Sequence, residues 1–154
     1  MRALGWCAMV LTWSALLACG KDSAPSASKA DTSQGLTVTD AHMFAPPPGQ
    51  KNGAIYLRLH NGGKSERQLV DAGAEIASSA MVHRSYYAEG IMHMRHVHHL
   101  TLAPGETLAF QPGGYHIMLT DIDSVPEVGG RFRAHMGFDQ GQTVAFDVEV
   151  RAQH

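Results

Sequence analysis

Four side chains with nitrogen or soft sulfur donors occur at a spacing that could form one metal site. They are His83, Met94, His116 and Met118. Side chains alternate between the faces of a strand, so His116 and Met118 would share one face while Ile117 takes the other. His83 and Met94 fit the arms of a hairpin turning near residues 88–90, where a two-residue loop would place them directly opposite each other. Two imidazoles and two thioethers favour copper, and Cu(I) over Cu(II) or zinc.

The strand that carries the last pair has a complete apolar face without them. Tyr115, Ile117 and Leu119 alternate with His116 and Met118. The latter two would then lie on the side that otherwise meets water, where a methionine has little reason to be. A core-filling methionine or a histidine bonded to a backbone carbonyl would explain any single member, but not all four. The pattern therefore favours a site formed by the whole set.

The spacing also resembles a known family. The pattern His83–x10–Met94–x21–His116–x–Met118 matches the copper-binding motif of the periplasmic PCu(A)C copper chaperones without a gap. The sequences that flank these residues also resemble that family, namely TDAHMFAPPPGQKNGAIYLRLHNGG, GIMHMR and LAPGETLAFQPGGYHIML. The resemblance therefore covers about residues 36–151. It implies a cupredoxin-like β-sandwich that carries Cu(I) toward copper enzymes, notably the CuA centre of cytochrome oxidase.

The chain departs from that family's pattern just after Met94. Where relatives usually read Met-Arg-Pro-Val, it reads MRHVHH and so adds His96, His98 and His99. A bend near Val97 could bring several of these imidazoles together, and imidazoles without thioether suit Cu(II). They predict an accessory, weaker Cu(II) site, with a solvated histidine-rich loop as the alternative. Two further methionines share faces with the predicted ligands and could form a soft outer ring: Met81 and Met92.

Composition narrows the remaining possibilities. A chain of 154 residues with a formal charge of −2 and singly scattered Lys and Arg indicates one domain that does not bind nucleic acid. Both cysteines, Cys7 and Cys19, lie in the first twenty residues, which excludes a blue-copper centre of the His-Cys type in the folded part. The sequence has neither a pair of carboxylates at a spacing useful for catalysis nor a nucleophile beside a base. It therefore does not suggest an enzyme.

The N-terminal residues have the features of a targeting segment. Met1-Arg2 precedes an apolar run too short to span a bilayer comfortably, and Leu16-Leu17-Ala18-Cys19 resembles the lipobox of bacterial lipoproteins. We therefore expect a signal peptide at residues 1–18, a lipidated Cys19 and a flexible linker through residue 35. The mature protein would be periplasmic and membrane-anchored, and Gly20, where Asp often marks inner-membrane retention, slightly favours the outer membrane. An ordinary signal peptide that happens to contain Cys is the alternative.

From Leu36 onward, short alternating segments are separated by turn residues every eight to twelve positions. They predict an all-β, single-domain protein, an antiparallel β-sandwich spanning residues 36–151. Strands are expected at residues 67–71 and 81–85, with a connection over residues 73–79. One face of the last strand should enter the core with one face of the strand before it: Val144, Phe146, Val148, Val150, Phe132, Ala134, Met136 and Phe138.

A domain of this kind could have one of four functions. The first is a metallochaperone that passes Cu(I) to an acceptor such as the oxidase subunit that carries CuA. The second is a copper buffer or resistance protein without a dedicated acceptor, which would use the same ligands. An oxidative polysaccharide-cleaving copper enzyme would need an N-terminal histidine, whereas the predicted mature N-terminus is Cys19. A purely structural lipoprotein would leave the His and Met pattern unexplained.

Overall fold

The computed structural model describes residues 31–33 and 35–153. The predicted signal peptide, Cys19 and most of the predicted linker lie outside these residues. Within them, no helix has the length and apolar character needed to cross a membrane.

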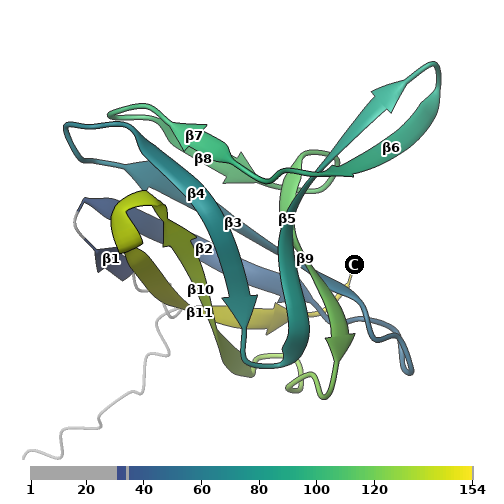
Figure 1. The fold of residues 1–154 in the computed structure, drawn as a ribbon. Coiled ribbons are helices and arrows are strands. Elements are labelled where there is room, and N and C mark those ends of the chain that lie inside the picture. Colours follow the sequence, from purple (N-terminus) through teal and green to yellow (C-terminus); the bar gives the residue numbers. More distant parts are fainter. Residues whose placement is uncertain (1–30, 34, 154) are drawn as a thin grey trace, which may run out of the picture.

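The described chain is built from strands and one short 3-10 turn, which confirms the all-β prediction (Figure 1). The strands are β1 (Asp31–Ser33), β2 (Leu36–Phe44), β3 (Gly53–Asn61), β4 (Arg67–Ala74), β5 (Ala77–Ala88), β6 (Ile91–His96), β7 (Leu100–Leu102), β8 (Thr107–Phe110), β9 (Tyr115–Ile122), β10 (Arg131–Phe138) and β11 (Thr143–Arg151), with the 3-10 turn at Asp139–Gly141.

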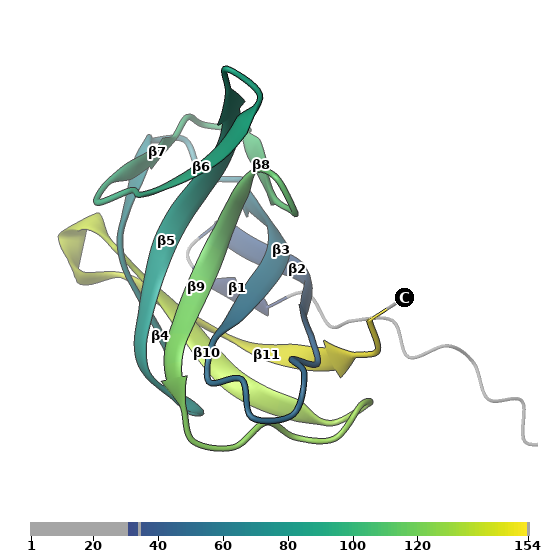
Figure 2. The ribbon, with the colours of Figure 1, turned by 90° about the vertical axis from the view of Figure 1, so that its right-hand side faces the viewer.

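Seven of these strands pair in a closed ring. Following hydrogen-bonded neighbours, the order is β5, β9, β3, β2, β11, β10 and β4. A single pair, Ala72 with Ala80, returns β4 to β5 and completes the ring (Figure 2). Most pairs are antiparallel as predicted, but β11 runs parallel to β2. The protein is therefore one β-barrel or flattened sandwich around a single core.

The core follows the predicted alternation. All eight inward positions predicted on β10 and β11 are buried, and so are Ile117 and Leu119 on β9. Apolar residues from both sides of the barrel meet in one cluster. Burial of these alternating faces is the main stabilising term and also sets which side of β9 remains for His116 and Met118.

Two boundaries differ from the sequence-based expectation. The predicted connection over residues 73–79 is mostly strand, because β4 continues to Ala74 and β5 begins at Ala77. Gly73, the first residue of that predicted connection, pairs with His135 in the β4–β10 ladder, and a Cβ there would collide with the His135 ring. Residues 31–33 were predicted as linker but pair with β2 as β1.

The second half of β5 leaves the barrel and forms a hairpin with β6 that projects from the body of the molecule (Figure 1). Glu89 and Gly90 form the two-residue loop, with φ of 53° and 78°. Positive φ at both central residues is typical of a type I′ turn, which matches the twist of the flanking strands. β6 therefore has β5 as its single strand partner in the described chain.

The hairpin separates its chemistry by face. One face carries the imidazole and thioether groups of His83, Met94 and His96. The other face carries two arginines, Arg84 with its guanidinium 5.3 Å from the Tyr115 ring centroid and Arg95 5.9 Å from that of Tyr86. The positive charges thus stack on aromatic rings on the side away from His83, Met94 and His96.

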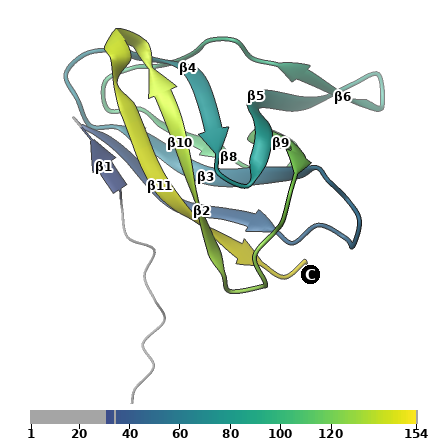
Figure 3. The ribbon, with the colours of Figure 1, turned by 60° about the horizontal axis from the view of Figure 1, so that its bottom comes forward.

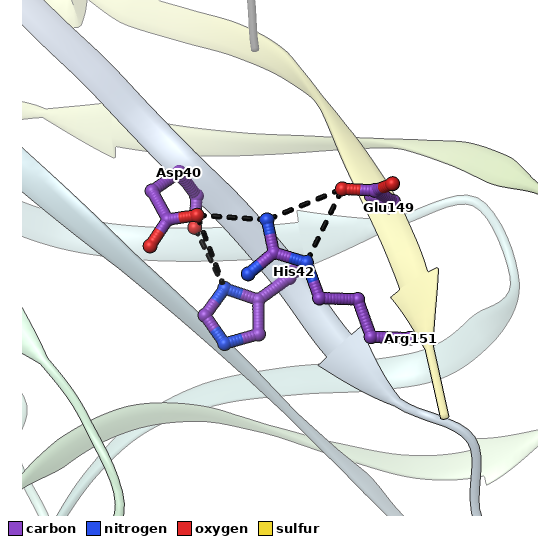
Figure 4. Close-up of polar contacts among 4 residues, drawn as sticks. All are labelled: Asp40, His42, Glu149 and Arg151. Atoms are coloured by element: carbon purple, nitrogen blue, oxygen red, sulfur yellow. Dashed lines mark hydrogen bonds and ion pairs between the residues drawn. The ribbon is translucent and has the colours of Figure 1, made fainter. Parts of the chain in front are cut away.

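A polar cluster joins β2 to β11 where β2 is irregular. Asp40 has a φ of 53°, and the β2–β3 register shifts between Thr39 and His42. The Arg151 guanidinium donates to Asp40 at 2.8 Å and to Glu149 at 3.2 Å, while His42 Nδ1 donates to the Asp40 carbonyl at 2.8 Å (Figure 4). These bonds fix the bulge and so the direction in which the following residues of β2 point.

Candidate metal centre

His116 is held in one orientation by the barrel. It is 6% exposed, and its Nδ1 lies 3.3 Å from the carbonyl oxygen of Gly114. A carbonyl oxygen only accepts, so Nδ1 donates and Nε2 keeps its lone pair. Nε2 lies 3.3 Å from the Met94 sulfur, which also presents lone pairs. Two electron-pair donors facing each other without a proton between them suit a soft cation.

His83 lies beside this pair. It is the direct partner of His116 across β5 and β9, with the ring centroids 6.0 Å apart. Its Nδ1 is buried and lacks a hydrogen-bond partner. Burial lowers the pKa of His83, and the neighbouring His116 and His96 lower this pKa further. The imidazole is therefore neutral at neutral pH, which is the form that binds metal.

The hairpin register differs from the prediction. His83 lies opposite His96, and Met94 lies opposite Ser85. Direct opposition of His83 and Met94 would require the loop to be Ala88-Glu89, which would put Ala88 at positive φ instead of Gly90. Met94 nevertheless reaches the site, because Ser85 and His83 are two positions apart and share a face. Met94 thus contacts His116, which is the cross-strand partner of His83.

Met118, the fourth predicted ligand, lies on β9 in the barrel wall. It projects from the same face of β9 as His116 and pairs with Met81 on β5. Its side chain also lines a hollow of about 230 Å³ that includes Phe44 and Tyr56. Met118 is half-buried, whereas Met94 is 54% exposed. Of the four predicted ligands, His116 is therefore buried in the barrel, Met118 lies two positions further along the same face of β9, and Met94 is exposed on the hairpin.

One supporting side chain was not predicted. The Tyr56 ring lies 6.4 Å from that of His116 and 5.8 Å from that of His42, which in turn contacts Phe44. These rings cover the outer side of β9, so His116 is buried although its position in the strand predicted contact with water. The outward alternation of Tyr56 along its strand was visible in the sequence, but its proximity to β9 depends on the β3–β9 pairing.

The predicted accessory residues divide into two groups. Met81 and His96 adjoin the four ligands as direct cross-strand partners of Met118 and His83. Met92 is 51% exposed and lies opposite Tyr87, further toward the hairpin tip. His96, His98 and His99 are all exposed, and the ring centroid of His98 lies 4.1 Å from that of His96.

The donor types decide which ions the patch could hold. Among residues 31–33 and 35–153, no three or more His, Cys, Asp or Glu side chains are placed to hold a metal ion together. The donors that the structure places beside His83 and His116 are instead imidazole and thioether groups, which suit a soft ion.

Comparison with known proteins agrees with this geometry. The closed barrel is similar to solved PCuAC domains, which confirms the PCuAC-type resemblance inferred from the sequence. The chain belongs to the family described as "Putative lipoprotein LpqE-like", whose model matches residues 36–150.

Three relatives illustrate the likeness. A protein of Leifsonia xyli subsp. xyli, named as a putative lipoprotein, is 28% identical over 118 residues, covering 76% of this chain and 70% of its own. The apo PCuAC domain from PmoF1 is 25% identical with a TM-score of 0.68, over 81% of this chain and all of that domain (100%). The solution structure of Cu(I)-DR1885 from Deinococcus radiodurans is 26% identical with a TM-score of 0.61, over 86% of this chain and 83% of that one.

Proposed function

We propose that this protein binds one Cu(I) through His83, Met94, His116 and Met118 and passes it to a copper-accepting protein. The observation that carries the proposal is the pair of facing donors, His116 Nε2 and Met94 Sδ at 3.3 Å, beside the buried and unpartnered Nδ1 of His83. Two neutral imidazoles and two thioethers add no charge to the ion and match the preference of Cu(I) for soft ligands. The likeness to Cu(I)-DR1885 supports the same metal.

Exposure of one ligand supports transfer in addition to storage. Met94 lies on a projecting hairpin and is 54% exposed, so an incoming ligand can approach the metal from that side. Cu(I) would then move by ligand exchange, in which an acceptor thiolate or imidazole replaces Met94 before the barrel ligands release the ion. The proposed acceptor is a copper enzyme, notably the oxidase subunit that carries the CuA centre.

Location would keep the domain near such an acceptor. Membership of a family described as lipoproteins supports a membrane-anchored, periplasmic protein. We assign the anchor to Cys19, within Leu16-Leu17-Ala18-Cys19, and Gly20 favours outer-membrane sorting. Replacing Cys19 with Ser should abolish acyl labelling and release the protein from the membrane fraction. Soluble, unacylated wild type would exclude this assignment.

A transfer assay tests the function directly. Full-length protein loaded with Cu(I) under reducing conditions is mixed with the apo CuA domain of an oxidase, and copper is measured on each after separation. Movement of copper to the CuA domain is expected. Tight binding with full retention would instead identify a copper buffer, which uses the same ligands. X-ray absorption that shows no sulfur neighbour around the bound copper would exclude the proposed site itself.

A further inference from the structure

The segment after β6 places two more imidazoles in a fixed position beside the proposed Cu(I) site. His96 ends β6 and His98 follows after one residue, with ring centroids 4.1 Å apart. His96 also lies opposite His83, with ring centroids 5.5 Å apart. Of the three histidines His96, His98 and His99, the structure therefore brings two together next to a predicted ligand.

This segment is attached to the barrel at both ends. The Val97 backbone N–H donates to the Val82 carbonyl at 2.8 Å, and the Val97 side chain packs against the core. Leu100 is buried and pairs with Leu69 at the start of β7. Because Val97 points inward, His96 and His98 on either side of it are held outward on one side. The anchoring argues against a solvated loop without fixed geometry.

The two rings line a hollow that suits a cation. Its volume is about 140 Å³, and it lies where β4 and β5 diverge above their single pair, Ala72 with Ala80. Met81 and Asp71 also line it, and Asp71 is the one charged side chain of the lining, apart from the titratable histidines. A hollow with two imidazoles, one thioether and one carboxylate, and without Lys or Arg, attracts a positive ion.

We propose that His96 and His98 bind a second copper ion, as Cu(II), next to the Cu(I) site. Imidazole nitrogens suit Cu(II), and copper leads the divalent ions in affinity for such ligands. Met81 and Asp71, which line the same hollow, would supply a thioether and a negative charge near the ion. His99 takes no part. The site is formed by residues other than the four Cu(I) ligands, so it does not depend on the proposed function.

The test keeps the two sites apart by filling the first with Ag(I). Ag(I) is a soft ion that cannot exchange an electron with Cu(II), and Cu(II) alone gives an electron paramagnetic resonance signal. Full-length Ag(I)-loaded protein is titrated with CuCl₂. Wild type should take up one Cu(II) whose spectrum shows two nitrogen ligands. The H96A/H98A variant should bind this Cu(II) at least about tenfold more weakly.

The matched control is the H93A/H99A variant, which also removes one histidine from β6 and one from the following segment. His93 lies on the opposite face of the hairpin, stacked on Tyr86 at 5.5 Å. This variant should bind Cu(II) like wild type. Equal loss in both variants would mean binding by dispersed surface imidazoles, and no loss in either would mean no site; each result overturns the proposal.

Ag(I) uptake by each variant checks the barrel and the first site. If H96A/H98A no longer takes up Ag(I), His96 belongs to the first site and the assignment of His96 and His98 to a separate site is wrong. H98A alone is a second variant, tested in every case, because His98 lies outside the strands. Unchanged Cu(II) affinity in H98A would also overturn the proposal.

Discussion

The two strands that supply the paired donors differ in how they are held. β9 is part of the barrel wall, where it pairs with β5 and β3, and His116 on this strand is 6% exposed. β6 pairs with β5 alone, all six of its residues are exposed, and Met94 is 54% exposed. In a third view the β6 hairpin again extends beyond the barrel (Figure 3). One half of the centre is thus preorganised and the other accessible.

This difference assigns separate roles to the two halves. A buried ligand with a fixed tautomer has already lost its rotamer freedom during folding, so little further entropy is lost when the ion binds. An exposed ligand on a projecting hairpin must be ordered by the ion, so it contributes less to affinity but can be displaced by an acceptor. We expect affinity to depend mainly on β9 and exchange rate on β6.

The largest effect should come from the buried half. H116A removes a preorganised nitrogen ligand and should weaken Cu(I) binding at least about 100-fold, measured by competition with a chromophoric Cu(I) chelator. It also leaves a cavity beside Tyr56, so the free energy of unfolding of the apo protein should fall by about 1–3 kcal/mol in urea titration. A loss of affinity no greater than that of M94A would contradict the proposed division.

M94A should weaken Cu(I) binding by about tenfold and leave the free energy of unfolding within about 0.5 kcal/mol of wild type, because Met94 lies outside the core. The matched control is M92A, since Met92 is similarly exposed on the same face of β6. M92A should bind Cu(I) like wild type. If M92A weakened binding as much as M94A, any exposed thioether of the hairpin would serve.

Strain in the turn should produce a smaller change. Gly90 has a φ of 78° and open space around it, so G90A introduces backbone strain without a collision. The hairpin should fray, lowering Cu(I) affinity severalfold while global stability changes by about 1 kcal/mol or less. Hydrogen exchange would locate faster amide exchange in residues 85–95 and unchanged exchange in β9. Equal acceleration in both strands would show that the hairpin and barrel open together.

The smallest effect concerns pH. His83 has its pKa lowered by burial and by its histidine neighbours, so the unfolded chain binds a proton more readily than the folded one. Its contribution to apo stability is therefore fully present above the unfolded pKa of ~6.5 and is lost as the pH falls through the lower folded value. Urea midpoints compared at successive pH values should decline less steeply in H83Q than in wild type. Identical slopes would exclude this origin.

Most of the fold and the candidate ligands could be predicted from residue types and from the alternation of apolar and polar residues. The faces of β9, β10 and β11 were predictable because burial enforces a period of two in any strand with one apolar face. The hairpin register was not, because shifting the loop by one residue moves every pair and only the positive φ at Gly90 selects the observed one. The connection predicted from residue 73 was wrong, because Gly73 lies in β4, where the lack of a Cβ leaves room for the His135 ring. Tyr56 reaches His116 through barrel closure, which local patterns do not encode.

The parallel pairing of β2 with β11 has a consequence for how the molecule forms. His42, in the first strand of the ring, pairs with Glu149, which the chain reaches only in its last strand. Contacts between such distant positions form only after a large loop has closed, so the entropy of loop closure is lost before the contacts stabilise the fold. β-barrels of this kind therefore fold slowly, on the millisecond to second scale. The ring cannot close until the whole chain is available. A chain that emerges from its N-terminus therefore cannot pair β2 with β11 until β11 has been made.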